Sequence, residues 1–350
     1  MPIPSTARQY IFPKLGSLDN LVLLPDAPVP KPKPTEVLLK AHAVSLQYRD
    51  LIVANGTYPS RLPDNLIPCS DVAGEIVAVG DAVKDWKVGD RVCPNFMLGK
   101  LFGDETTEAI SATALGGAVD GTLVEYRAYP SQALVKIPDH LSYEEASTLP
   151  CAGLTAYNAL LDGYEPLKGG DTVLVLGTGG VSIFALQFAI ASGATVICTS
   201  SSDEKLKIAS KLGAQHVINY NTTPDWDEEI KRLTSGRGVD HIIEVGGNGT
   251  LMKSINALRI GGAISIIGFV GGHNIAAPDI IGICIRKSLK IRGIQVGSVQ
   301  QFNNMNKLIA ANPAVTRPVV DKVFPFNEAK AAYQYLASQA HVGKVVIRVD

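Results

Sequence analysis

The sequence predicts an α/β fold in which a doubly wound parallel sheet follows a β-rich, barrel-like domain. The chain has 350 residues, which is enough for about two domains. Residues 172–202 carry no charged side chain and run from a strand pattern through a glycine cluster into a helical pattern. Strand and helix patterns then alternate to about residue 295, whereas the first 150 residues show mostly short strands and turns.

The first domain is predicted from strand and turn signals. Its expected elements are a strand at 36–44, a glycine-interrupted strand pair at 67–79 and a turn followed by a strand at 86–92. Helical patterns begin at residue 143 and at 155–161, where we expect the passage into the second domain.

The uncharged segment predicts a strand, a tight turn, a helix and a second strand. Val173–Leu176 is short and rich in branched side chains, and Gly177, Gly179 and Gly180 interrupt any continuous helix. An apolar helical pattern resumes at residue 183, Gly193 ends it, and 194–199 reads as a strand. A membrane span is the alternative for so long an apolar segment, but a spanning helix gains nothing from the glycine cluster.

The rest of the chain continues the alternation and then changes character. Expected elements up to residue 295 are helices at 208–212, 227–233 and 251–258, and strands at 216–220, 241–245, 263–267 and 289–295. The tail predicts helices at 302–310 and 327–338 and strands at 319–324 and 344–349. Because six strands complete the parallel sheet, we expect the tail to rejoin the first domain, giving domains of 1–152 with 297–350 and of 153–296.

Composition narrows the class of partner. The chain is 46% hydrophobic and 19% charged with a net charge of −1, so neither nucleic acid nor an anionic membrane is expected, and a small molecule is. The first residues lack an apolar stretch of signal-peptide length, which favours a cytoplasmic protein. Five scattered cysteines are typical of reduced thiols.

The glycine cluster matches a phosphate-binding fingerprint. In G-x-G-x-x-G the glycines serve the turn, the close approach of pyrophosphate and the packing of helix on strand. Gly177, Gly179 and Ser182 occupy these positions here, and serine is a small replacement in the third. A strand before the motif, a helix after it and further strands beyond favour dinucleotide binding over a purely structural turn.

The end of the second strand favours NADP(H) over NAD(H). An acidic residue about 20 positions after the glycines would bind the ribose 2′-hydroxyl and repel a 2′-phosphate. Ser200, Ser201 and Lys205 lie in this region instead and can donate hydrogen bonds or positive charge to a phosphate. A serine followed by acidic residues is also an ordinary helix N-cap, and both roles can coexist.

Five motifs make the whole chain resemble the medium-chain dehydrogenase/reductase superfamily, near its zinc-free quinone oxidoreductase and enoyl reductase branch. They are AGEIVAVG at 73–80, KVGDRV at 87–92, LPCAGLTAY at 149–157, VLVLGTGGV at 173–181 and GKVVI at 343–347. The resemblance implies a split GroES-like catalytic domain, a Rossmann domain for NADP(H), an active site in the cleft between them and a homodimer. It also implies a set of cofactor-binding residues: Gly177, Thr178, Gly179, Gly180 and Val181 at the pyrophosphate, Ser200, Ser201 and Lys205 at the 2′-phosphate, Tyr220 at the adenosine, and Thr155, Gly246, Phe269 and Val270 towards the nicotinamide.

The metal ligands of the zinc-dependent relatives are mostly missing. A catalytic zinc takes three protein ligands of the Cys, His or carboxylate type. By the resemblance these fall at Gln47, Ser70 and Cys151, of which only the cysteine matches. Residues 94–150 hold none of the four cysteines of the structural zinc site. We therefore expect no metal.

A metal-free site favours an acceptor that is already electrophilic. We expect hydride transfer from NADPH to an α,β-unsaturated carbonyl compound or a quinone. Tyr48 is the candidate proton donor, since its segment lines the cleft in relatives, and a buried structural tyrosine is the alternative. A metal-free alcohol dehydrogenase or ketone reductase, or a non-catalytic NADPH-binding protein, remain rival functions.

Overall fold

The computed structural model describes residues 2–59, 62–268, 270 and 280–349. The chain divides into two compact units, of which unit 1 comprises Met1–Leu154, Val296–Ala311 and Arg317–Asp350, and unit 2 comprises Thr155–Gln295 and Asn312–Thr316. Within the described residues, no helix combines the length and the apolar composition needed to cross a bilayer.

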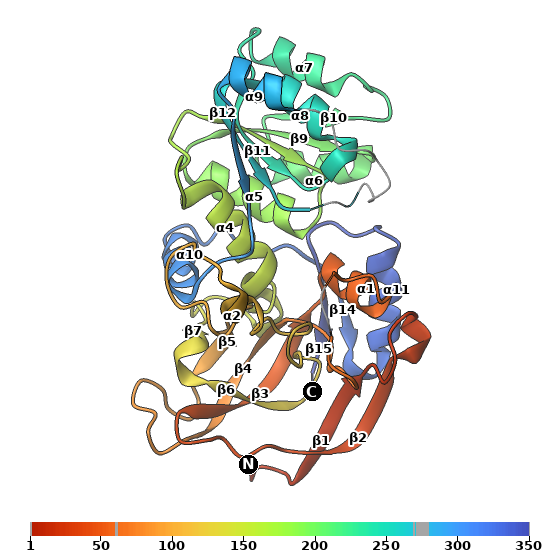
Figure 1. Ribbon diagram of the computed structural model, residues 1–350, viewed down its shortest axis with the longest axis vertical. Coiled ribbons are helices and arrows are strands. Elements are labelled where there is room, and N and C mark those ends of the chain that lie inside the picture. The colour runs from red at the N-terminus through yellow and green to blue at the C-terminus, as the bar shows by residue number, and fades with distance from the viewer. Residues whose placement is uncertain (1, 60–61, 269, 271–279, 350) are drawn as a thin grey trace. The chain divides into compact units, whose positions relative to one another are not determined.

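Unit 1 is built on a seven-stranded, mainly antiparallel sheet within the described residues, in the order β14-β15-β3-β4-β5-β7, with β6 also paired to β3 (Figure 1). Its strands are β3 (Glu36–Ser45), β4 (Asp71–Val79), β5 (Arg91–Pro94), β6 (Tyr126–Pro130), β7 (Leu134–Lys136), β14 (Val320–Pro325) and β15 (Lys344–Arg348). A separate antiparallel pair consists of β1 (Thr6–Ile11) and β2 (Val22–Pro28). The C-terminal strand β15 pairs antiparallel with β3 and parallel with β14, so both ends of the chain contribute to one sheet.

Unit 1 also contains helices, most of them short. They are α1 (Tyr48–Ala54), α2 (Glu108–Ser111), α3 (Tyr143–Ala146), α10 (Val299–Ala311), α11 (Ala329–Ala337), the 3-10 turns Leu18–Asn20, Ser131–Ala133 and Phe326–Glu328, and a π-helix at Leu149–Gly153. The predicted strand pair at 67–79 is wrong, because one strand, β4, starts only at Asp71. Cys69 has a φ of 68°, a left-handed conformation that breaks an extended strand at this position.

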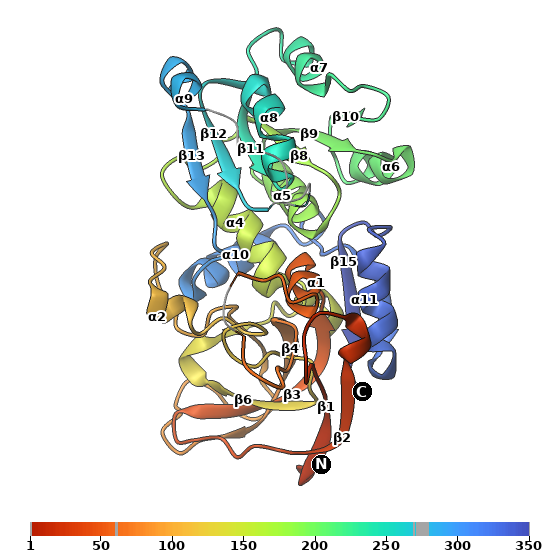
Figure 2. The same ribbon diagram turned by 45° about the vertical axis from the view of Figure 1, so that its right-hand side comes forward.

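Unit 2 is a six-stranded sheet, parallel throughout the described residues, in the order β10-β9-β8-β11-β12-β13. Its strands are β8 (Thr172–Leu176), β9 (Thr195–Ser200), β10 (His216–Asn219), β11 (Val239–Glu244), β12 (Leu258–Ile266) and β13 (Lys290–Gly293). Its helices are α4 (Leu154–Leu161), α5 (Gly180–Ala191), α6 (Asp203–Lys211), α7 (Trp226–Leu233), α8 (Leu251–Ala257), α9 (Ile281–Lys287) and a 3-10 turn at Gly247–Gly249. In sequence order the strands run 3-2-1-4-5-6, the doubly wound order of dinucleotide-binding sheets, and Figure 2 shows helices beside the strands. The sequence did not predict α9.

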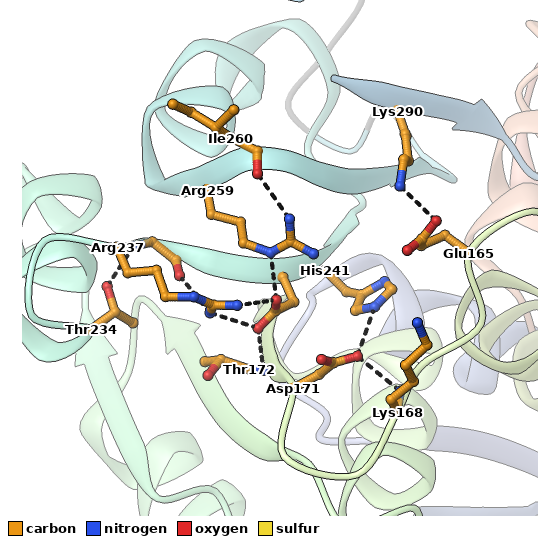
Figure 3. A network of polar contacts seen from close by, with 12 residues as sticks. Glu165, Lys168, Asp171, Thr172, Thr234, Arg237, His241, Arg259, Ile260 and Lys290 are labelled. Carbon is orange, nitrogen blue, oxygen red and sulfur yellow. Dashed lines mark hydrogen bonds and ion pairs between the residues drawn. The ribbon is translucent and has the colours of Figure 1, made fainter. Parts of the chain in front are cut away.

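A polar network joins the strands of unit 2 at their amino-terminal edge (Figure 3). Asp240 is 2% exposed and accepts hydrogen bonds from the Thr172 N–H at 2.9 Å, from Arg237 at 2.6 and 2.9 Å and from Arg259 at 2.5 Å. Burial by itself would raise the pKa of Asp240, but these donors outweigh burial and hold the pKa well below its usual range. Because ligands of doubly wound sheets bind at the carboxyl ends of the strands, we assign this network to fold stability.

Candidate functional site

The predicted glycine loop lies between the end of β8 and the start of α5. Gly177 has a φ of 73°, a left-handed conformation that favours glycine, and it turns the chain out of the strand. Gly179 caps α5, and Gly180 and Val181 begin the helix. The first N–H groups of a helix have no partner within it and favour an anion, so this helix end can hold a pyrophosphate.

Neither the backbone conformation nor the packing around position 179 requires a glycine there. Its φ of −73° and ψ of −179° are open to any residue. Apart from its two chain neighbours, a Cβ built on Gly179 would meet no atom of the described residues within 4 Å, and the same holds at Gly177. Neither strain nor packing therefore explains Gly179, whereas the approach of an external group to the backbone does.

The serine in the third fingerprint position keeps the close contact between helix and strand. Ser182 is buried, and its hydroxyl donates a 2.7 Å hydrogen bond to the carbonyl oxygen of Leu176, the last residue of β8. In the fingerprint a glycine permits this approach by its small size. Here the Ser182 hydrogen bond accompanies the contact between helix and strand, so a serine in place of the third glycine does not open the loop.

The three predicted 2′-phosphate residues differ in exposure at the end of β9. Ser200 is buried and its hydroxyl accepts a bond from the Ser202 N–H at 3.4 Å, whereas Ser201 is exposed and Lys205 partly exposed. Ser202 caps α6 by accepting from the Lys205 N–H at 3.5 Å. The N-cap role therefore falls to Ser202, and Ser201 and Lys205 are the better placed of the three for an external ligand.

One neighbour at this strand end was missed by the sequence argument. The Asn221 side chain donates a 3.1 Å hydrogen bond to the Ser201 carbonyl oxygen and so holds the exposed serine. Tyr220, predicted at the adenosine, lies beside it, is exposed, and donates its backbone N–H to the Ser200 carbonyl at 3.1 Å. An asparagine after a strand is a common turn residue, so the sequence carries no specific signal for its role.

The residues predicted towards the nicotinamide come from separate parts of unit 2. Thr155 is buried in α4, and Thr178 is buried in the glycine loop. Gly246 follows β11, and Val270 follows β12 and donates its N–H to the Val245 carbonyl at 3.1 Å, which brings these two strand ends together. Phe269 lies outside the described residues.

Glu244 organises the loop that contains Gly246, and it was also missed from the sequence. This fully buried carboxylate accepts from the N–H groups of Gly246 and Gly247 at 2.8 and 3.1 Å, and from the hydroxyls of Thr250 and Ser254 at 2.6 and 2.5 Å. Four donors compensate the burial of the charge and hold the turn after β11.

In unit 1, the three positions expected for zinc ligands converge on one carboxylate. Asp71 accepts hydrogen bonds from the Gln47 side-chain amide at 2.7 Å, the Ser70 hydroxyl at 2.6 Å and the Cys151 backbone N–H at 2.9 Å. Cys151 lies in the π-helix, a geometry often found at functional sites. Tyr48, the candidate proton donor, begins α1 next to Gln47 and is 39% exposed.

Sheet register adds a buried lysine to this group. Val346 of β15 pairs with Ser45 of β3, and continuing that antiparallel register places Lys344 across from Gln47. Lys344 is 4% exposed, and its ammonium donates to the Gln47 Oε1 at 2.8 Å and to the Leu46 carbonyl oxygen. In the sequence, Lys344 is marked only by its place at the start of a final strand whose next three residues are apolar.

Burial sets the electrostatics of this group. It raises the pKa of Asp71 to about 7, against the opposing effects of the Lys344 charge and the bonds from Ser70 and Cys151. Burial also raises the pKa of Asp50, to about 6; that carboxylate accepts from the Gln47 backbone N–H at 2.7 Å. The pKa of Lys344 is lowered by burial, against the attraction of Asp71. The group therefore combines a buried ammonium with carboxyl groups that are easily protonated.

These residues do not fit a catalytic zinc ion. An amide, a hydroxyl and one thiol replace the ligand set that zinc takes, and burial raises the pKa of the Cys151 thiol further from the thiolate that would bind metal. The Gln47 oxygen is already bonded to an ammonium. Among the described residues, no three His, Cys, Asp or Glu side chains are grouped to hold a metal.

The sheet order of unit 2 and the glycine loop define a protein of the Rossmann-fold dehydrogenase class. Residues 33–139 match the family model of the alcohol dehydrogenase GroES-like domain, and residues 180–311 match that of zinc-binding dehydrogenases. A zinc-type alcohol dehydrogenase-like protein of Schizosaccharomyces pombe is 50% identical over 91% of this chain and 92% of its own.

Two solved structures are similar to this chain over nearly its whole length. A putative alcohol dehydrogenase of Sinorhizobium meliloti matches with a TM-score of 0.91 at 38% identity, covering 99% of this chain and 100% of that one. The Escherichia coli quinone oxidoreductase, solved in complex with NADPH, matches with a TM-score of 0.82 at 25% identity over 98% of this chain and 100% of its own. The chain belongs to the medium-chain dehydrogenase/reductase superfamily and is an oxidoreductase, as the resemblance predicted.

Proposed function

We propose that the protein is an NADPH-dependent, zinc-independent reductase of an activated C=C bond in an α,β-unsaturated carbonyl compound, or of a quinone. The observation that carries the proposal is the bonded network at positions 47, 70 and 151, where Asp71 and Lys344 engage groups that do not suit a metal. Without a Lewis acid, a simple ketone lacks activation, whereas a conjugated acceptor is already electrophilic.

NADP(H) is the cofactor we propose for unit 2. Gly179 leaves open backbone for a pyrophosphate, and Ser201 and Lys205 offer donors to a 2′-phosphate. The NADPH complex of the Escherichia coli relative supports the same choice. When bound, this cofactor would supply the hydride.

Tyr48 is the residue we propose for the proton step. Its exposed phenol carries an O–H that can donate to the substrate carbon left electron-rich after hydride addition. Its neighbours in the chain, from Gln47 to Asp50, are held by buried hydrogen bonds that fix the start of α1.

Product analysis tests the reaction. Incubation with NADPH and a conjugated enone should give the saturated ketone, with no loss of rate after dialysis against a zinc chelator. Allylic alcohol would instead support a metal-free alcohol dehydrogenase or ketone reductase. Tight NADPH binding without oxidation across enones and quinones would support a non-catalytic binding protein.

Two lysine variants in α6, one at the proposed phosphate site and one outside it, test whether this site binds the 2′-phosphate of NADPH. Lys205→Ala should weaken NADPH binding at least tenfold while leaving NADH affinity within twofold, because only NADPH carries the 2′-phosphate. Lys207→Ala removes an exposed lysine paired with Glu204 at 2.6 Å, and should leave both affinities unchanged. Equal small effects of the two variants would reject the phosphate assignment.

We also propose that the enzyme is a cytoplasmic homodimer. Light scattering after size-exclusion chromatography and cell fractionation test the two statements separately, and a monomeric mass or a membrane fraction would reject them.

A further inference from the structure

The buried network of unit 1 determines the orientation of one side-chain amide. Gln47 Oε1 accepts from the Lys344 ammonium at 2.8 Å, so the other end of the amide, Nε2, is the group that donates to Asp71 at 2.7 Å. An ammonium has no lone pair and a carboxylate acts as an acceptor, which excludes the flipped amide. The Gln47 carboxamide therefore lies between the Lys344 ammonium, which donates to its oxygen, and the Asp71 carboxyl group, which accepts from its nitrogen.

Within the described residues, these bonds use only one of the two donors of the amide. A carboxamide nitrogen carries two N–H groups, and the bond to Asp71 uses one of them. A cation bonded to the amide oxygen withdraws electron density from the nitrogen, which makes the remaining N–H a stronger donor. Lys344 thus strengthens a hydrogen-bond donor as well as holding it in place.

Gln47 is also the member of this network that precedes Tyr48 at the start of α1. Ser70 and Asp71 are fully buried and Lys344 is 4% exposed, whereas Gln47 is 7% exposed and is followed by Tyr48 at 39%. The second Gln47 N–H therefore belongs to a residue next to the phenol that we propose for proton transfer.

We propose that Gln47 is a catalytic residue that donates its second Nε2–H to the carbonyl oxygen of the conjugated acceptor, and that Lys344 is its positioning residue. This inference rests on the proposed function. Hydride adds to the β carbon, the C=C electron pair forms a new double bond to the carbonyl carbon, and the carbonyl π pair moves to oxygen. The Gln47 N–H stabilises that developing negative oxygen, and a proton then reaches the α carbon to complete the reduction.

Three variants test the proposal in the full-length enzyme with NADPH and an enone. Gln47→Leu should lower kcat about 100-fold, the loss expected for one oxyanion donor, with NADPH affinity within twofold of wild type. Gln47→Glu keeps the shape and the partner of Lys344 but loses the N–H and places a second carboxyl group against Asp71, so thermal unfolding first checks that this variant is folded. Lys344→Met should lower kcat more than it changes the enone KM, because it removes the positioning of the donor.

A pH profile separates catalysis from structure. Gln47→Glu should be as slow as Gln47→Leu at pH 8, and its rate relative to wild type should rise at least tenfold towards pH 5.5, where the introduced carboxyl gains a donor proton. Gln9→Glu, at a partly buried glutamine of β1, is the matched control and should follow wild type.

The experiments distinguish a failure of the role of Gln47 from a failure of the proposed function. If wild type reduces enones and folded Gln47→Glu stays within threefold of it at every pH, the role of Gln47 is overturned and the proposed function stands. If wild type binds NADPH but reduces neither enones nor quinones, the proposed function fails and this inference fails with it.

Discussion

Gly179→Ala should separate cofactor binding from folding. The Gly179 backbone suits alanine, and among the described residues a Cβ there meets no atom within 4 Å beyond its chain neighbours, so the free energy of unfolding should be unchanged or raised by about 0.4–1 kcal/mol. The methyl group would instead occupy the approach of the pyrophosphate. Losing one charge-assisted hydrogen bond costs about 1.5–3 kcal/mol, which weakens NADPH binding about 10- to 150-fold.

The assay combines thermal unfolding with a fluorescence titration of NADPH, and two glycines provide controls. Gly236→Ala should lose about 1–2 kcal/mol of stability, because its φ is 82°, while keeping NADPH affinity. Gly177→Ala should lose both stability and NADPH affinity, since the φ of Gly177 is 73° and the residue lies in the glycine loop. Wild-type NADPH affinity in Gly179→Ala would refute the phosphate assignment, and a clear loss of stability would refute the claim that the protein leaves this space open.

Other predictions concern the Figure 3 network and Tyr48. Asp240→Ala should lower the free energy of unfolding by about 1.5–3 kcal/mol, because the partly buried Thr172 N–H and Arg259 lose a charged acceptor. Glu204→Ala, which breaks an exposed ion pair, should have a clearly smaller effect, and equal effects would contradict this. Because the folded pKa of Asp240 lies below its unfolded value of about 4, the difference between wild type and Asp240→Ala should be complete at pH 7 and shrink as the pH falls below about 4; chemical unfolding across pH measures it, and a constant difference would reject the stated charge state. Tyr48→Phe should reduce turnover while keeping NADPH affinity, and unchanged kinetics would remove Tyr48 from the mechanism.

Local patterns in the sequence predicted most of unit 2. Each strand and helix there leaves its own signal of length and apolar period, and the glycines mark the turn between β8 and α5. The helix α9 was missed because it is short and its residues Ile281 and Ile285 are exposed, which gives no amphipathic pattern. The strand pair at 67–79 failed for a related reason, since the left-handed Cys69 has no marker that propensity detects.

Some residues of the candidate site could be predicted from the sequence, and others could not. Residues of the glycine loop are consecutive, so their chemistry could be inferred from spacing. Glu244 and Asn221 were not identified, because their importance lies in backbone groups that they bond after the chain has turned. Ser200 was expected at the phosphate, yet its burial leaves Ser201 and Lys205 as the better candidates.

By itself, the sequence determined the superfamily and the doubly wound sheet, because each depends on residue identity or on short-range periodicity. The replacement of two expected zinc ligands by Gln47 and Ser70 stays a prediction of the resemblance. Only the tertiary structure decided what replaces those ligands. Lys344 lies 297 positions from Gln47 in the chain and reaches it through the pairing of β15 with β3. Sheet register is a long-range property, so the bonded group of Gln47, Asp71 and Lys344 has no signature in any one segment of the sequence.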